Sequence, residues 1–231
     1  MLVRSARSVT TIGKNNGQRI TQFGVIDSEY GLIGTNDYFL KEAQIYGEGD
    51  PTTYVYQVAS GAVRSCKLLS DGRCQITAFH LPGDIFGYEL SATHPTSAEA
   101  IVDTTLLTAT KRSLQQAAAN ADVVRKLWDL TAAKLKHAED HLLLLGRKTA
   151  LERVAAFLIE MDCRLERSGD LPLPMRRRDI GDYLGLTLET VSRVLSALHD
   201  EGIIGFSGHA RHIVLRDRDR LRMLELPAEL N

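Results

Sequence analysis

Residues 182–204 read DYLGLTLETVSRVLSALHDEGII, and this stretch decides the fold. Around its start, three apolar residues are spaced as on one face of a short helix: Ile180, Tyr183 and Leu184. Gly185 follows the last turn of that helix, where a residue of positive φ is favoured. Thr187 stands where its hydroxyl can cap a second helix. The stretch therefore predicts two helices joined by a tight turn, with Leu186 filling the corner.

The second predicted helix has one apolar face and one polar face. We expect it to bury four residues: Leu188, Val191, Leu195 and Leu198. Two helices joined by a glycine-bearing turn form a helix-turn-helix, whose second helix enters the major groove of DNA with its first turns. Glu189, Ser192 and Arg193 would then face the base edges together. Arginine pairs bidentately with guanine, glutamate accepts from cytosine, and serine reaches either.

An alternative for Glu189 and Arg193 is an ordinary ion pair on the helix surface, because they are four residues apart. The surrounding sequence favours a DNA-binding role for these two residues. Residues 201–215, EGIIGFSGHARHIVL, predict a hairpin wing with Ser207-Gly208 at its tip. We expect the basic run, the turn and the wing tip, with His212 beside it, to contact the DNA backbone. The residues assigned to this contact are Arg176, Arg177, Arg178, Thr187, Thr190, His209 and Arg211.

The overall composition is that of an ordinary globular protein, with 231 residues, 44% of them apolar, and a formal net charge of −1. A near-neutral chain binds nucleic acid only through a local basic patch. The sequence has no run of about 18 apolar residues that would span a membrane, and its N-terminus lacks the apolar core of a signal peptide. Three cysteines, at no metal-binding spacing, indicate a cytoplasmic protein with reduced thiols.

The N-terminal half predicts a β domain. Residues 1–28 are polar and without period, so we expect a flexible extension. Residues 29–112 contain short β-branched and aromatic runs separated by turn signals, which predict a sandwich or barrel. Asp71-Gly72 is expected at the tip of one hairpin.

Residues 113–146 predict helices, the first opened by a capping box of Ser113 and Gln116. Apolar or small residues then recur with a period of 3.5, the period of a coiled-coil seam. They are Val124, Trp128, Thr131, Leu135, Ala138, Leu142 and Leu145. This pattern favours a parallel pair of helices and hence a homodimer. The alternative is a long helix packed only on its own β domain.

Residues 147–231 predict a second domain. Gly146 is expected to break the preceding helix, and Thr149 with Glu152 forms a capping box for a new helix from Ala150 to about Arg167. The glycine and prolines of residues 168–174 are expected to end that helix.

A β domain, a seam helix and a winged helix-turn-helix resemble the CRP/FNR superfamily of bacterial transcription regulators over residues of about 30 to 225. DIGDYLGLTLETVSR, residues 179–193, is similar to the DNA-binding motif of its FNR and FixK branches. The resemblance implies an α+β fold with a cupin-like double-stranded β-roll. It also implies that Glu189, Ser192 and Arg193 read palindromes of the form TTGAT-N4-ATCAA. Ser192 and Leu188 depart from the CRP branch, which usually has glycine and arginine there.

The resemblance further implies partners and genes. The regulator would be mainly an activator that contacts RNA polymerase, acting on genes for microaerobic or anaerobic metabolism. Regulators of the FixK branch are often controlled through the synthesis of the regulator itself. In FNR an acidic residue at the seam resists the pairing of the two helices. The aligned residue here, Ala138, is small and neutral.

Neither effector typical of the family is supported by the sequence. FNR holds an iron–sulfur cluster with N-terminal cysteines, whereas this chain has none before Cys66. Cyclic-nucleotide members use an arginine-serine pair. Here Thr96 replaces that arginine, and no basic residue lies between Tyr88 and Thr110. We therefore expect no cofactor and no small effector.

Several alternatives remain open. A ligand in the β-roll could regulate the protein. Alternatively, the chain could be a cupin-type enzyme. Such an enzyme needs a cluster of His and Glu ligands on its strands, and the presence of only one histidine there, His80, argues against it. His137 and His141 have a spacing that can bind zinc, but a solvated helix face is the simpler interpretation, so no metal is assigned. Cys163 is expected to be a buried core thiol, with a redox role possible.

Overall fold

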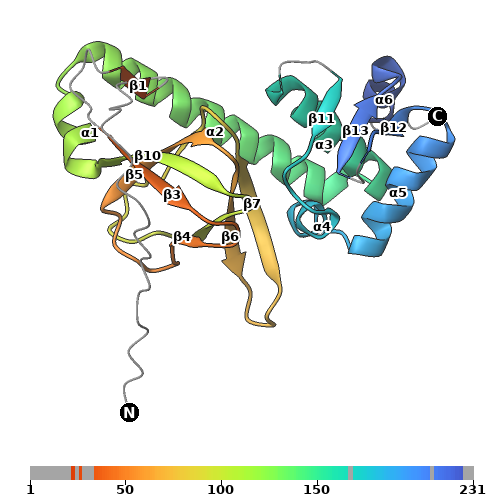
Figure 1. The fold of residues 1–231 in the computed structure, drawn as a ribbon, viewed down its shortest axis with the longest axis horizontal. Helices are drawn as coiled ribbons and strands as arrows, with labels where there is room; N and C mark the ends of the chain where they lie inside the picture. Colours follow the sequence, from red (N-terminus) through yellow and green to blue (C-terminus); the bar gives the residue numbers. More distant parts are fainter. Residues whose placement is uncertain (1–21, 24–25, 28–33, 166–168, 209–210, 226–231) are drawn as a thin grey trace.

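The computed structural model describes residues 22–23, 26–27, 34–165, 169–208 and 211–225 (Figure 1). A β domain lies at one end and a smaller helical domain at the other, and one long helix, α2, runs along both. The predicted N-terminal extension falls mostly outside the described residues. The four described residues of that segment form a short antiparallel pair, β1 (Gln22–Phe23) with β2 (Ile26–Asp27).

The β domain is a roll of two four-stranded antiparallel sheets, as the sequence predicts. One sheet has the order β3-β10-β5-β8 and the other the order β4-β9-β6-β7. The strands are β3 (Thr35–Phe39), β4 (Gln44–Tyr46), β5 (Tyr54–Ser60), β6 (Val63–Leu68), β7 (Cys74–His80), β8 (Ile85–Phe86), β9 (Ser97–Ala100) and β10 (Thr104–Thr110). Apolar side chains of both sheets pack between them, among them Val58 and Leu106 of the first sheet and Tyr46 and Val63 of the second. Hairpin β6–β7 turns at Asp71-Gly72, which confirms the predicted tip.

The first helix, α1 (Lys111–Ala117), begins two residues before the predicted start. The prediction that Ser113 caps it is wrong, because the Thr110 hydroxyl accepts the Ser113 backbone N–H at 3.1 Å. Thr110 ends β10 in an extended conformation, so its side chain reaches the orphan donors of the next turn. The helix consequently starts as soon as the strand ends.

The long helix, α2 (Ala121–Arg147), is capped by Asn120 and passes through Gly146. The helix ends at Arg147, one residue past the predicted break at Gly146. The chain leaves the helix at Lys148, where the extended Thr149 begins the next capping box. A glycine inside a helix weakens it but does not end it when the following residues supply the caps.

Two parallel stripes run along α2, each with spacings of four and three residues. One stripe packs on its own chain and consists of Val123, Leu127, Leu130, Lys134, His137, His141 and Leu144. The other is the predicted seam, and its members are exposed or only partly buried. The helix thus packs on its own domains while presenting a second face outward.

The C-terminal domain contains α3 (Ala150–Arg164), α4 (Arg177–Leu184), α5 (Leu188–Asp200) and α6 (Arg218–Glu225) around a three-stranded sheet. Its strands are β11 (Asp170–Pro172), β12 (Ile204–Phe206) and β13 (His212–Leu215), in the order β11-β13-β12. Thr149 and Glu152 form the predicted capping box of α3, which ends at Arg164. β11 was not predicted, because the glycine and prolines of residues 168–174 indicate only the end of a helix.

The two domains share one apolar cluster. Phe79 of β7 packs against Phe157 of α3 and Tyr183 of α4, with ring centroids 6.3 and 5.1 Å away. Within the described part of the chain, no helix is long and apolar enough to cross a membrane.

Candidate DNA-binding site

The helix-turn-helix forms as the sequence predicts. Gly185 ends α4 with φ 63° and ψ 37°, the left-handed conformation that glycine adopts most readily. The Leu186 N–H then donates to the Gly181 carbonyl at 2.9 Å. A Cβ on Gly181 would lie 2.7 Å from the Leu186 carbonyl oxygen, so the close turn also requires glycine at that position. Thr187 caps α5 by accepting the Thr190 N–H at 3.2 Å.

Helix α5 separates its buried face from its reading face. Val191, Leu195 and Leu198 are buried, as predicted. Leu188 is not: it is 40% exposed, because it lies at the first position of the helix, beyond the edge of the core.

The three residues assigned to base readout share the outward face of α5. Glu189 and Arg193 are exposed, and Ser192 is partly buried between them. Across the described residues, no hydrogen bond or ion pair joins Glu189 to Arg193. The alternative of a surface ion pair thus has no support in this structure, and both side chains are available to a ligand.

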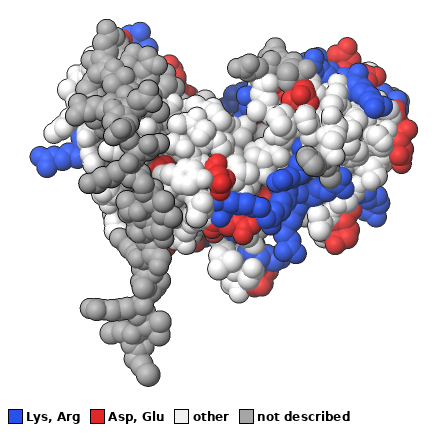
Figure 2. Space-filling model, viewed as in Figure 1, with Lys and Arg blue, Asp and Glu red and all other residues white. Residues whose placement is uncertain are grey.

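The three arginines of the basic run, residues 176–178, lie in three different surroundings. Arg176 is exposed, and its guanidinium lies 2.7 Å from Glu42 of the β-roll. Arg177 is partly buried, with its guanidinium 5.5 Å from the centroid of the Phe206 ring. Arg178 lines a crevice between α4 and the β-roll, together with Asp182, whose pKa is raised by burial and by the neighbouring Asp179. Figure 2 shows the blue Lys and Arg surface gathering over this region.

The wing also forms as predicted, with β12 and β13 paired around Gly208, whose φ is 66°. Arg211 is exposed beside the tip, whereas His209 lies outside the described residues. His212 contacts the carboxylate of Asp170 on β11. No local sequence pattern indicates that contact, because β11 was not predicted.

The predicted seam forms an apolar stripe on the outer face of α2. The exposed fractions are 73% for Trp128, 72% for Leu142, 61% for Leu135 and 49% for Val124. Thr131 and Ala138 are also exposed, and Leu145 is partly buried. Large apolar side chains that repeat along one exposed helix face are typical of a surface that another protein covers.

Comparison with known proteins agrees with this architecture. Residues 152–224 match the Crp-like helix-turn-helix domain, and residues 37–121 match the cyclic nucleotide-binding domain. The nitrogen fixation regulation protein FixK of Azorhizobium caulinodans is 45% identical over 203 residues, covering 84% of this chain and 80% of that protein. The chain belongs to the CRP/FNR family. Its similarity to FixK proteins places it among the FixK-type transcription regulators, which bind DNA and are not enzymes.

Two further relatives support the FixK assignment. FixK of Rhizobium meliloti is 44% identical over 181 residues, covering 78% of this chain and 82% of that protein. The structure of FixK2 from Bradyrhizobium japonicum is 62% identical, with a TM-score of 0.82, and covers 85% of this chain and all of that chain.

Between Tyr88 and Thr110 of this FixK-type chain, Glu89 and Ser97 contact other residues of the chain. The Glu89 carboxylate lies 3.3 Å from Nδ1 of buried His94 and 4.0 Å from Nζ of Lys134 on α2. Burial lowers the pKa of the His94 ring, although the neighbouring Glu89 carboxylate opposes that shift. The Ser97 hydroxyl accepts the Glu48 backbone N–H at 3.0 Å.

No basic residue lies within the segment between Tyr88 and Thr110, but two helices outside it bring lysines close to Glu89. Lys111 of α1 donates to Thr52 Oγ1 at 2.9 Å and to the Glu89 and Ser91 carbonyls at 2.6 and 3.2 Å. Lys134 lies beside Glu89 and over the Tyr88 ring. In this structure both lysines contact groups of the chain itself.

The thiols and histidines give little indication of a metal or redox centre. Burial raises the pKa of the Cys66 thiol to about 12, and burial also raises that of Cys74. Cys163 is exposed, so its predicted place in the core is wrong; it lies on the outer face of α3. Among the described residues, no three His, Cys, Asp or Glu side chains are arranged to hold a metal ion.

Proposed function

We propose that this FixK-type chain is a homodimer that reads palindromes of the form TTGAT-N4-ATCAA. Glu189, Ser192 and Arg193 would read the bases of each half-site. The observation that carries the proposal is the exposed face of α5, where no hydrogen bond or ion pair joins Glu189 to Arg193. Their chemistry suits cytosine and guanine edges in the major groove.

The remaining predicted contacts would position the protein on the DNA backbone. The cap Thr187 and the first-turn residue Thr190 lie at the N-terminus of α5, where backbone N–H groups also attract phosphate. Arg178 and Arg211 are exposed and can reach phosphates directly, and Arg176 would have to exchange Glu42 for phosphate. These contacts fix orientation and contribute little to sequence preference.

The regulator would act mainly as an activator, with RNA polymerase as its protein partner, on genes for microaerobic or anaerobic metabolism. The support is the similarity to FixK proteins, two of which are named nitrogen fixation regulation proteins.

We further propose that the dimer needs no small effector and no iron–sulfur cluster. The contacts that Lys111 and Lys134 make with Glu89 of the same chain support this view. The second candidate is a CRP-type regulator switched by a ligand in the roll. It is favoured by the same two lysines, since an anionic ligand could compete for them.

Replacing Arg193 with alanine tests the base readout. Arg193→Ala is expected to lower the affinity for the TTGAT-type palindrome by about 1–3 kcal/mol while leaving the affinity for unrelated DNA nearly unchanged. The measurement is a binding titration by fluorescence anisotropy at fixed salt.

Arg211→Ala is the matched control, because Arg211 is an equally exposed arginine assigned to phosphate. It should weaken binding to both DNAs alike and flatten the salt dependence by about one unit. If Arg193→Ala weakened both DNAs equally, Arg193 would not read a base.

A further inference from the structure

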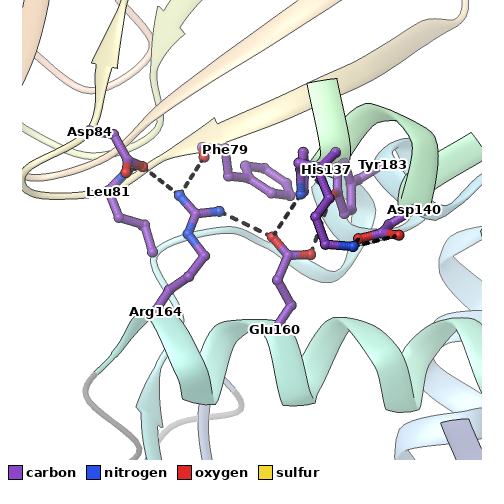
Figure 3. A network of polar contacts seen from close by, with 9 residues as sticks. Phe79, Leu81, Asp84, His137, Asp140, Glu160, Arg164 and Tyr183 are labelled. Carbon is purple, nitrogen blue, oxygen red and sulfur yellow. Dashed lines mark hydrogen bonds and ion pairs between the residues drawn. The ribbon is translucent and has the colours of Figure 1, made fainter. Parts of the chain in front are cut away.

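A buried tyrosine hydroxyl joins the reading domain to the long helix. Tyr183, on α4, is 2% exposed. Its hydroxyl donates to Glu160 Oε2 of α3 at 3.3 Å and lies 3.2 Å from Nε2 of His137 on α2 (Figure 3). A phenol has one proton to donate and lone pairs to accept, so both contacts are satisfied when His137 carries a proton on Nε2.

The same cluster reaches the β-roll through Arg164. Arg164 Nη1 donates to Glu160 Oε1 at 3.2 Å, and Nη2 donates to the Phe79 carbonyl at 2.8 Å. Nη2 also pairs with the Asp84 carboxylate at the start of β8. Figure 3 shows Arg164 between the β-roll and Glu160, with Tyr183 beyond. Four parts of the chain thus meet at one polar cluster: the β-roll, α2, α3 and α4.

The position of this cluster on α2 connects it to the seam. His137 and His141 lie on the packed stripe, and the His141 ring stacks on Tyr183 with centroids 4.2 Å apart. The adjacent residues Ala138 and Leu142 belong to the seam. The Tyr183 contacts therefore fix α4, and α5 behind it, relative to the helix face that would pair with a second copy.

We propose that the Tyr183 hydroxyl is a positioning group that sets the angle of the reading domain on α2. It thereby sets the distance between the two half-sites that the dimer accepts. This inference rests on the proposed function, because half-site spacing has meaning only for a dimer that reads a palindrome. In such dimers the two reading helices must lie one helical turn of DNA apart, so a loosened angle lowers affinity for the full site.

Tyr183→Phe tests the proposal, since it removes the hydroxyl and keeps the buried ring. We expect affinity for the full palindrome to fall about tenfold, as for one buried hydrogen-bonding group with its partners left unpaired. Affinity for a DNA with a single half-site should change less than about twofold, and the penalty for a spacer one base pair longer should shrink. Tyr54→Phe is the matched control, because Tyr54 is 44% exposed on β5.

Glu160→Gln provides the second variant, since it weakens the acceptor without touching the helix-turn-helix. It should reproduce the Tyr183→Phe pattern, and the double variant should lose little more than either single variant. Equal loss on half-site and palindrome in both variants would show a structural role and overturn the proposal, as would no loss in either. If the wild-type protein bound neither DNA, the proposed function itself would fail.

Discussion

Leu135→Asp is expected to convert the protein to a monomer and to abolish its binding to the full palindrome. Leu135 lies at the centre of the α2 seam and is 61% exposed in the single chain. In a parallel pair it would meet the same residue of the second copy. Each copy would lose the burial of a leucine, about 2–5 kcal/mol, and would place a carboxylate in an apolar contact. Sedimentation velocity measures the assembly, and an anisotropy titration measures the binding.

Ala133→Asp serves as the control for this substitution. Ala133 lies on α2 two residues away, exposed and outside both stripes, so the same charge should leave the dimer intact. Circular dichroism would show that the helices of both variants remain folded. A Leu135→Asp protein that still sediments as a dimer would place the interface on another surface.

Inserting five base pairs between the half-sites is expected to reduce binding to the level of a single half-site, at least about 100-fold. Five base pairs turn the second half-site to the opposite face of the DNA. A dimer whose reading domains share an apolar cluster with the β-rolls cannot follow that rotation.

The control for the insertion is a change of the four spacer bases without a change of length. It should alter affinity only by the bending and twisting preferences of the new sequence. If the five-base-pair insertion bound as tightly as the original site, the two reading domains would be independent of each other.

The sequence predicts the helix-turn-helix well because each of its determinants is local. The αL glycine at 185, the cap at 187 and the apolar face of α5 act within a few residues of chain. The capping box of Thr149 and Glu152 is equally local and also forms. The seam is visible from sequence because a helix repeats its faces regularly.

The errors come from competition between neighbouring signals. Ser113 has the right spacing for a cap, but Thr110 is available three residues earlier at the end of a strand. The end of α2 differs less from the prediction, since the helix ends at Arg147, one residue past Gly146. Propensity is overruled where a better-placed partner satisfies the backbone.

Contacts between distant segments were not predictable. Arg176 and Glu42 are 134 residues apart, and Tyr183 lies 46 residues from His137. Lys111 and Lys134 approach Glu89 from two helices, which no local pattern reveals. Such pairs depend on how the two domains pack, so one sequence without related sequences cannot identify them.

The most direct test of the account is a binding titration with protein purified in air, free of metal and nucleotide, at stated salt. We expect tight binding to the TTGAT-N4-ATCAA palindrome, with a dissociation constant of about 10⁻⁸ M or lower and at least about 1,000-fold weaker binding to a scrambled site. Cyclic AMP at millimolar concentration should change neither value. A protein that binds the palindrome only after nucleotide, reductant or cell extract is added would contradict the claim that the dimer acts without an effector.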